Sequence, residues 1–162
     1  MITQARLKQL LDYDPATGVF VWKVSRRGHR AGAVAGTKRP DGYNQIRIDG
    51  SVYYAHRLAW LYITGKWPTE QIDHRNRTPA DNRFINLREA SPSENARNSS
   101  KPAANTSGHK GVYRDVTCGK WRAQIMVDGV RVHLGLFDLL EEAAAAYAEA
   151  SAQHHKEFGR VA

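Results

Sequence analysis

Apolar residues in the first half of the chain follow helical spacing in some segments and strand-like runs in others. Leucines at positions 7, 10 and 11 recur at helical spacing and predict a helix over residues 3–13. An apolar and aromatic run at residues 57–63 predicts a short buried helix. Asp49-Gly50, between two strand-like runs, indicates a hairpin. We therefore expect strands at residues 19–22, 43–48, 51–54, 71–74 and 84–88, a basic loop at 25–40 and a polar loop at 75–82.

A second set of elements is predicted beyond residue 90. Ser91-Pro92-Ser93-Glu94 combines a capping box with proline at the first helical position, so a helix that carries Asn95 is expected to begin there. Residues 99–106 lack apolar periodicity and are expected to form a linker. Three strands (111–113, 121–127 and 130–134) and a helix after Asp138 should follow. The pattern predicts an α+β protein with domains at residues 1–98 and 107–162.

The charge of the chain favours a polyanionic partner. Lys and Arg number 24 against 16 Asp and Glu, which gives a net charge of +8. The single cysteine, Cys118, excludes an internal disulfide and a cysteine-based zinc site, and it is expected in a turn. No apolar run reaches the roughly 20 residues needed to span a bilayer, and no signal-peptide pattern is present. These features fit a protein of a reducing cytoplasm with a polyanionic partner, and its oligomeric state is left open.

The candidate chemistry lies in Asp73-His74, followed by Asn86 and then Asn95. A histidine can deprotonate water near neutral pH, and a carboxylate with an amide oxygen suits Mg²⁺. A second amide, Asn86, can orient the imidazole. This set is sufficient to hydrolyse a phosphodiester. The non-catalytic alternatives are a surface turn for Asp73-His74 and a strand-end hydrogen bond for Asn86.

The segments 72–74, 81–88 and 94–95 resemble the HNH nuclease motif of phage and group I intron homing endonucleases. That resemblance implies two strands and a helix around one metal ion (the ββα-metal fold). It assigns His74 as general base, Asp73 and Asn95 as metal ligands, and Asn86 as the residue that fixes the His74 ring. Asn95 stands where the colicin-type branch has a histidine, which favours Mg²⁺ or Mn²⁺ over Zn²⁺.

The segments 110–114, 119–125, 134–137 and 141–147 resemble the Apetala/ethylene-response-factor DNA-binding domain. That resemblance implies a three-stranded antiparallel sheet in the DNA major groove with one helix packed behind it. Strand alternation agrees, because it places basic and amide side chains on one face. The alternative is a solvated sheet with incidental charge. The predicted DNA contacts are Lys110, Tyr113, Arg114, Lys120, Arg122, Gln124, Arg131 and His133.

Taken together, the two resemblances predict an HNH endonuclease of the homing type that nicks double-stranded DNA at sites chosen by its C-terminal domain. They also imply a cytoplasmic protein of a bacterial or phage-infected cell. Tyr113, Asp115 and Met126 replace arginines of the plant proteins, so the plant target sequence is not transferred. The alternative function is a non-catalytic DNA-binding regulator whose HNH-like half is structural. We expect His56 to be a hydrogen-bonded core or scaffold residue, with a phosphate contact as the alternative, and His154 with His155 to be solvated.

Overall fold

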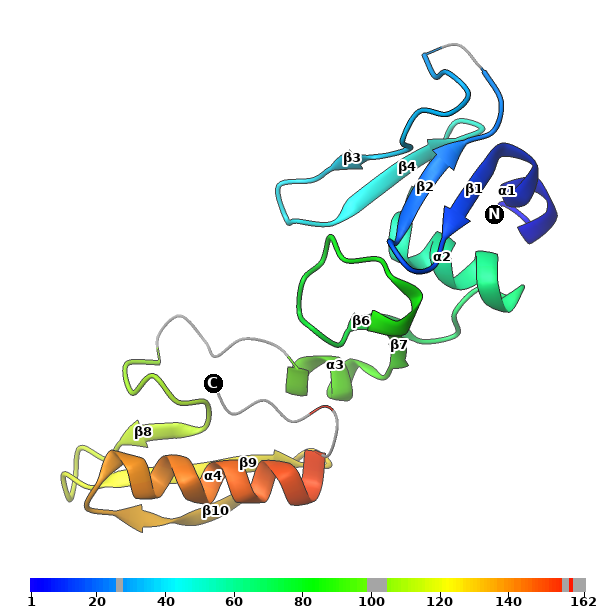
Figure 1. Cartoon of the computed structure of the whole chain (residues 1–162). Helices are drawn as coiled ribbons and strands as arrows, with labels where there is room; N and C mark the ends of the chain where they lie inside the picture. Colours follow the sequence, from blue (N-terminus) through cyan, green and yellow to red (C-terminus); the bar gives the residue numbers. More distant parts are fainter. Residues whose placement is uncertain (26–27, 99–104, 156–157, 159–162) are drawn as a thin grey trace. The chain divides into compact units, whose positions relative to one another are not determined.

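The chain forms two compact units, residues 1–91 and residues 92–162 (Figure 1). The structure, a computed structural model, describes residues 1–25, 28–98, 105–155 and 158. Short helices accompany four small sheets whose strand pairs are all antiparallel. The predicted α+β class is therefore confirmed. Among the described helices, none combines the length and the apolar character that crossing a membrane would require.

The first unit begins with helix α1 (Gln4–Leu10), which leads directly into a hairpin of β1 (Leu11–Asp14) and β2 (Val19–Trp22). The prediction of one helix through residue 13 was wrong. Leu11 and Tyr13 are buried while Asp12 and Asp14 are exposed, which is strand alternation. Because Leu11 fits both periods, the cross-strand pairing with β2 decides its conformation.

A three-stranded sheet and a helix complete the core of this unit. The strands are β3 (Thr37–Lys38), β4 (Asn44–Ile48) and β5 (Ser51–Tyr54), and β5 leads into α2 (Ala55–Thr64). The hairpin expected around Asp49-Gly50 is confirmed, whereas the expected loop at residues 25–40 contains strand β3. The largest fully buried side chains of the core are Phe20, Leu7, Leu11, Ile46, Ile48, Leu58 and Leu61.

The predicted active-site segment is a two-stranded ribbon, β6 (Gln71–His74) and β7 (Leu87–Ala90). The strand expected to begin at Phe84 begins instead with a 3-10 turn, Phe84–Asn86, whose first amide donates to the Pro15 carbonyl. Asp73 pairs with Arg88 across the ribbon. Nε and Nη2 of Arg88 lie 2.8 and 2.7 Å from Oδ2 of Asp73, and both side chains are buried. A buried ion pair therefore fixes the register of β6 and β7.

The β1–β2 hairpin supports the loop between β6 and β7. The Tyr13 hydroxyl donates to the Asn82 carbonyl at 2.6 Å. Gly18, at the turn of the hairpin, has φ +75°, and a Cβ there would lie 2.5 Å from backbone atoms of both Asn82 and Arg83. Glycine is therefore required at this position by conformation and by space.

The second unit consists of α3 (Pro92–Asn98), strands β8 (Val112–Arg114), β9 (Trp121–Val127) and β10 (Val130–Phe137), and helix α4 (Leu140–His155). Helix α4 lies along one face of the three-stranded sheet (Figure 1). The helix and the sheet bury a small apolar core between them, which consists of Val112, Ala123, Ile125, Ala143, Tyr147 and Ala150. Residues 99–104, most of the predicted linker, lie outside the described residues.

Two minor predictions about this unit have different outcomes. Cys118 lies exposed in the turn between β8 and β9, as expected. His154 is exposed, but His155 is buried, and its Nε2 lies 2.8 Å from the Met126 carbonyl. The prediction that His155 is solvated was therefore wrong, because the last turn of α4 packs on β9.

Replacement of Gly18 by alanine should destabilise the first unit. Gly50→Ala is the matched control, since Gly50 also has positive φ (+83°) but nothing lies within 4 Å of the place that a Cβ would take there. The control should lose about 1–2 kcal/mol from the left-handed conformation alone. Gly18→Ala should lose clearly more free energy of unfolding, because the backbone of Asn82 and Arg83 must also move. Urea midpoints from tryptophan fluorescence test this, and equal losses in the two variants would contradict it.

Removal of Arg88 should be more damaging than removal of an exposed arginine of the same region. Arg88→Leu leaves the buried Asp73 carboxylate without its arginine, a change that typically costs about 3–5 kcal/mol. Arg83→Leu breaks a partly exposed pair with Asp81, in which the arginine side chain is 48% exposed, and should cost clearly less than Arg88→Leu. The double variant Asp73→Leu/Arg88→Leu should recover most of the lost stability in the same urea measurement. No recovery would mean that the pair does not act as a unit.

Candidate active site

Asp73 and His74 occupy the end of β6, and both are buried, at 5% and 4% exposure. Burial lowers the pKa of His74, whereas the polar side chain of Asn82 and the charges of Asp73 and Asp81 act in the opposite direction. The ring is therefore neutral near pH 7 and can accept a proton. Asn82 was not identified from the sequence as a partner of His74, although it lies in the Asp-Asn-Arg-Phe segment that suggested the motif.

Asn86 holds the loop between the strands. Its Nδ2 donates to Oδ1 of Asn76 at 3.0 Å and to the Asp81 carbonyl at 2.8 Å, and its Oδ1 accepts from the Asn76 amide at 2.9 Å. The backbone carbonyl of Asn86 accepts from the Arg75 amide at 2.9 Å. Both N–H groups of the carboxamide are thus used on the loop. Asn86 was expected to fix the His74 ring. Its hydrogen bonds instead fix the loop that follows His74, so its effect on the ring is indirect.

The His74 ring contacts two other rings, those of His56 and Tyr43. The rings of His56 and Tyr43 have centroids 5.2 and 5.8 Å from that of His74. His56 is buried as expected, but its Nδ1 has no hydrogen-bond partner among the described residues, so it is not the hydrogen-bonded scaffold residue that was predicted. Burial, followed by the nearby His74 and Arg57, lowers the pKa of His56 to about 3. His56 is therefore neutral throughout the physiological range.

The two predicted metal ligands lie in different units. Asp73 belongs to the first unit, where Arg88 binds its Oδ2. Asn95 lies on α3 in the second unit. In the described ranges, no three His, Cys, Asp or Glu side chains cluster as a metal site. The available donors at these two positions are a carboxylate and an amide, and both provide hard oxygen atoms.

The second unit brings several predicted DNA contacts onto the sheet face opposite its core. Ala123 and Ile125 are buried, so Arg122, Gln124 and Met126 point to the other face. Cross-strand register adds the neighbours of this row: Tyr113 beside Arg122, His133 beside Gln124, and Arg131 beside Met126. The outer face also exposes Met126 and Leu136. It is therefore a mixed basic and apolar surface.

The basic residues of this unit differ in how far they are already engaged. Arg122 pairs with Asp115, and Lys120 pairs with Asp138 at 3.0 Å. The Arg114 guanidinium lies 5.5 Å from the centre of the Trp121 ring. Arg131 and His133 are exposed, and no carboxylate among the described residues pairs with Arg131. Arg131 is thus the arginine of this face most available to a phosphate.

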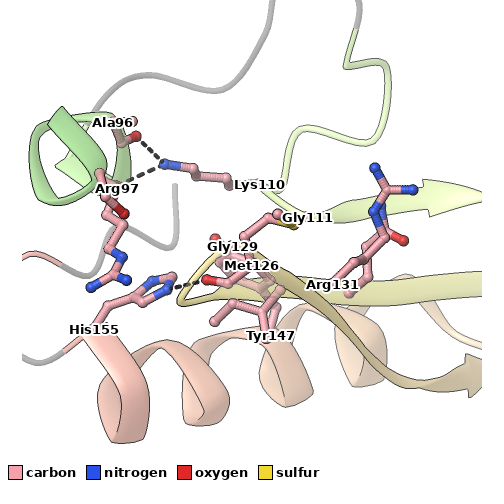
Figure 2. Close-up of a pocket in the computed structure, with 12 residues that line it drawn as sticks. Ala96, Arg97, Lys110, Gly111, Met126, Gly129, Arg131, Tyr147 and His155 are labelled. Carbon is pink, nitrogen blue, oxygen red and sulfur yellow. Dashed lines mark hydrogen bonds between the residues drawn. The ribbon is translucent and has the colours of Figure 1, made fainter.

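Lys110, one of the predicted DNA contacts, lies at the end of α3. Figure 2 shows its ammonium group directed at the last turn of α3, where it donates to the carbonyls of Arg97 (2.7 Å) and Ala96 (3.3 Å). Arg97 pairs with Asp128 at 3.1 Å. Lys110 and Arg97 flank a pocket of about 370 Å³ whose lining includes Ile125, Met126 and Tyr147. Lys110 therefore caps α3.

Comparisons with known proteins find similarity over the segment that carries the candidate site and beyond it. A family model described as HNH endonuclease matches residues 53–97, which include Asp73, His74, Asn86 and Asn95. Protein 3.8 of Escherichia phage T7 is 33% identical over 106 residues, which cover 65% of this chain and 87% of the phage protein.

A solved structure of the HNH homing endonuclease I-HmuI, in a study of DNA binding and cleavage, shares 21% identity at a TM-score of 0.42. That match covers 55% of this chain and about half (51%) of the solved one. The family match and the phage relative confirm the predicted enzyme class: this chain belongs to the HNH endonuclease family and is a nuclease.

Proposed function

We propose that the protein is a metal-dependent endonuclease of the homing type that hydrolyses DNA phosphodiesters and nicks one strand in each event. The observation that carries the proposal is the buried, neutral His74 beside Asp73, at the start of a loop that Asn86 holds in place. The net charge of +8 supports a nucleic-acid substrate. One candidate site per chain accounts for nicking as the elementary event.

In the proposed reaction, His74 acts as the general base. It removes a proton from a water molecule as the water oxygen bonds to phosphorus and the bond from phosphorus to the leaving sugar oxygen breaks. The leaving oxygen then takes a proton from solvent. The loop that Asn86 holds follows directly after His74 and helps to keep the imidazole in place.

Asp73 and Asn95 would hold the divalent cation. Arg88 fixes the Asp73 carboxylate, and the Asn95 amide contributes a second oxygen donor. Two oxygen donors suit Mg²⁺, which retains most of its water ligands, with Mn²⁺ as a substitute, whereas Zn²⁺ favours nitrogen and sulfur. When bound, the cation supplies neutralisation of the negative charge on the scissile phosphate.

We further propose that the outer face of the β8–β9–β10 sheet binds double-stranded DNA in the major groove. The exposed Arg131 and His133 support this, together with the row of Tyr113, Arg122 and Gln124. Arginine and amide side chains can contact phosphates and purine edges. Helix α4 begins with Glu141 and Glu142 and packs on the opposite face, which keeps its acidic turn away from this surface.

His74→Ala should abolish nicking of supercoiled plasmid in Mg²⁺ or Mn²⁺ and leave the Kd for DNA nearly unchanged, because the base takes no part in holding DNA. His154→Ala, which changes an exposed histidine, is the control and should nick at the parent rate. EDTA should stop the parent enzyme. Undiminished nicking by purified His74→Ala would reject the proposed role of His74.

Arg131→Ala should weaken DNA binding and reduce the slope of log K against log salt concentration by about 0.9, the change expected for one phosphate contact. Lys8→Ala removes one positive charge from α1 and serves as the control for net charge. Fluorescence anisotropy over a salt series measures both slopes. An unchanged slope for Arg131→Ala, or an equal change in both variants, would contradict binding through this sheet.

A further inference from the structure

The structure raises the question of what fixes the plane of the His74 ring. Asn86, the residue expected to do so, uses both of its N–H groups on Asn76 and Asp81. The printed geometry of the His74 ring is instead a pair of ring contacts, with His56 and with Tyr43. Contacts between rings constrain the plane of an imidazole independently of its hydrogen bonds. Since a base acts on a water molecule in a defined position, this constraint bears directly on the rate.

Two aromatic rings provide such a constraint. The ring of His56 meets that of His74 at 5.2 Å and 82°, an edge-to-face arrangement, and the ring of Tyr43 meets it at 5.8 Å and 60°. His56 and Tyr43 also contact each other, with centroids 5.3 Å apart. The three rings therefore form a closed triangle. Aromatic pairs favour offset or edge-to-face geometry, so two neighbours at different angles restrict the orientation of the third.

His56 itself is firmly held. It lies in the first turn of α2, at 7% exposure, between the neighbouring buried Ala55 and Leu58. The Tyr54 ring also stacks on His56 at 5.4 Å and 21°, and the Arg39 guanidinium lies 5.4 Å from the centre of the Tyr54 ring. Nδ1 of His56 is buried, and no described residue hydrogen-bonds to it. His56 is therefore held by contacts with neighbouring rings, and it contacts His74 through its own ring.

We propose that His56, together with Tyr43, is a positioning residue that fixes the plane of the His74 imidazole for attack on the phosphodiester. The inference rests on the proposed function of His74 as the general base. His56 touches neither water nor DNA in this role. It acts through the ring of His74, so its contribution belongs to the rate of the chemical step and not to DNA affinity.

The test compares three replacements of His56. His56→Phe keeps an aromatic ring, His56→Gln keeps polarity and similar bulk without a ring, and His56→Ala removes both. We expect His56→Ala and His56→Gln to lower the single-turnover nicking rate about 10- to 100-fold at unchanged Kd for DNA. His56→Phe should stay close to the parent rate. Tyr53→Ala is the matched control. Tyr53 lies three positions before His56, and its partly buried ring stacks on Trp67.

A second readout follows the ring directly. In long-range ¹H–¹⁵N NMR spectra, the His74 ring of the parent protein and of His56→Phe should give one sharp set of signals. The ring in His56→Ala and His56→Gln should give broadened or multiple signals. A purely structural role for His56 would lower the thermal midpoint, as for Tyr53→Ala, without changing the His74 signals in the folded protein. If His56→Ala does not fold, His56→Gln decides.

The outcomes separate this inference from the proposed function. Nicking by His74→Ala at the parent rate would reject His74 as the base, and with it the inference. An inactive His74→Ala beside a fully active His56→Gln would reject the positioning role alone. Equal loss of rate in His56→Phe and His56→Gln, with both folded, would also overturn it, because the ring would then not be the feature that matters.

Discussion

The carboxamide of Asn86 is the interaction on which the nuclease site most depends. It closes the loop after His74 through Asn76 and the Asp81 carbonyl, while the Asn86 backbone carbonyl binds Arg75. A polar loop has little apolar surface to bury, so hydrogen bonds must supply the order that packing supplies elsewhere. The buried Asp73–Arg88 pair fixes the strands on which this loop stands.

The N-terminal hairpin extends this support. Tyr13 donates to the Asn82 carbonyl, the Phe84 amide donates to Pro15, and Gly18 lets the two backbones approach. The hairpin, α2 and the β6–β7 ribbon share one apolar core. Residues 1–22 thus belong to the structure that holds the catalytic loop, which the motif alone does not suggest. The short strands of the site gain their stability from neighbours distant in sequence.

The second unit has a small core, and its polar contacts are correspondingly important. Alanines on α4 and Gly111 allow Tyr147 to lie directly against the sheet, since a Cβ at Gly111 would meet that ring at 2.2 Å. Lys110 caps α3, and Arg97 on α3 pairs with Asp128 at the β9–β10 turn. The helix that carries Asn95 is thus fastened to the same unit as the proposed DNA-binding sheet.

The sequence by itself determined those features whose causes are local. Asp49-Gly50 specifies a tight turn, and the hairpin forms there as predicted; Asp128-Gly129 makes the same kind of turn between the predicted strands β9 and β10. Ser91-Pro92 starts α3, and strand β6 has the predicted bounds, because capping, proline and alternation act over a few residues. The motif that carries His74 and the enzyme class could likewise be predicted.

Tertiary structure decided what depends on pairing and burial. Leu11 joins a strand because Trp22 lies opposite, and His155 is buried because α4 crosses β9. The same applies within the site, where the partners of His74, Asn86 and Lys110 could not be predicted from spacing. A side chain with several possible hydrogen bonds or ring contacts takes those that the folded chain brings within reach. Sequence therefore determined which chemical groups are present, and the fold determined which of them meet.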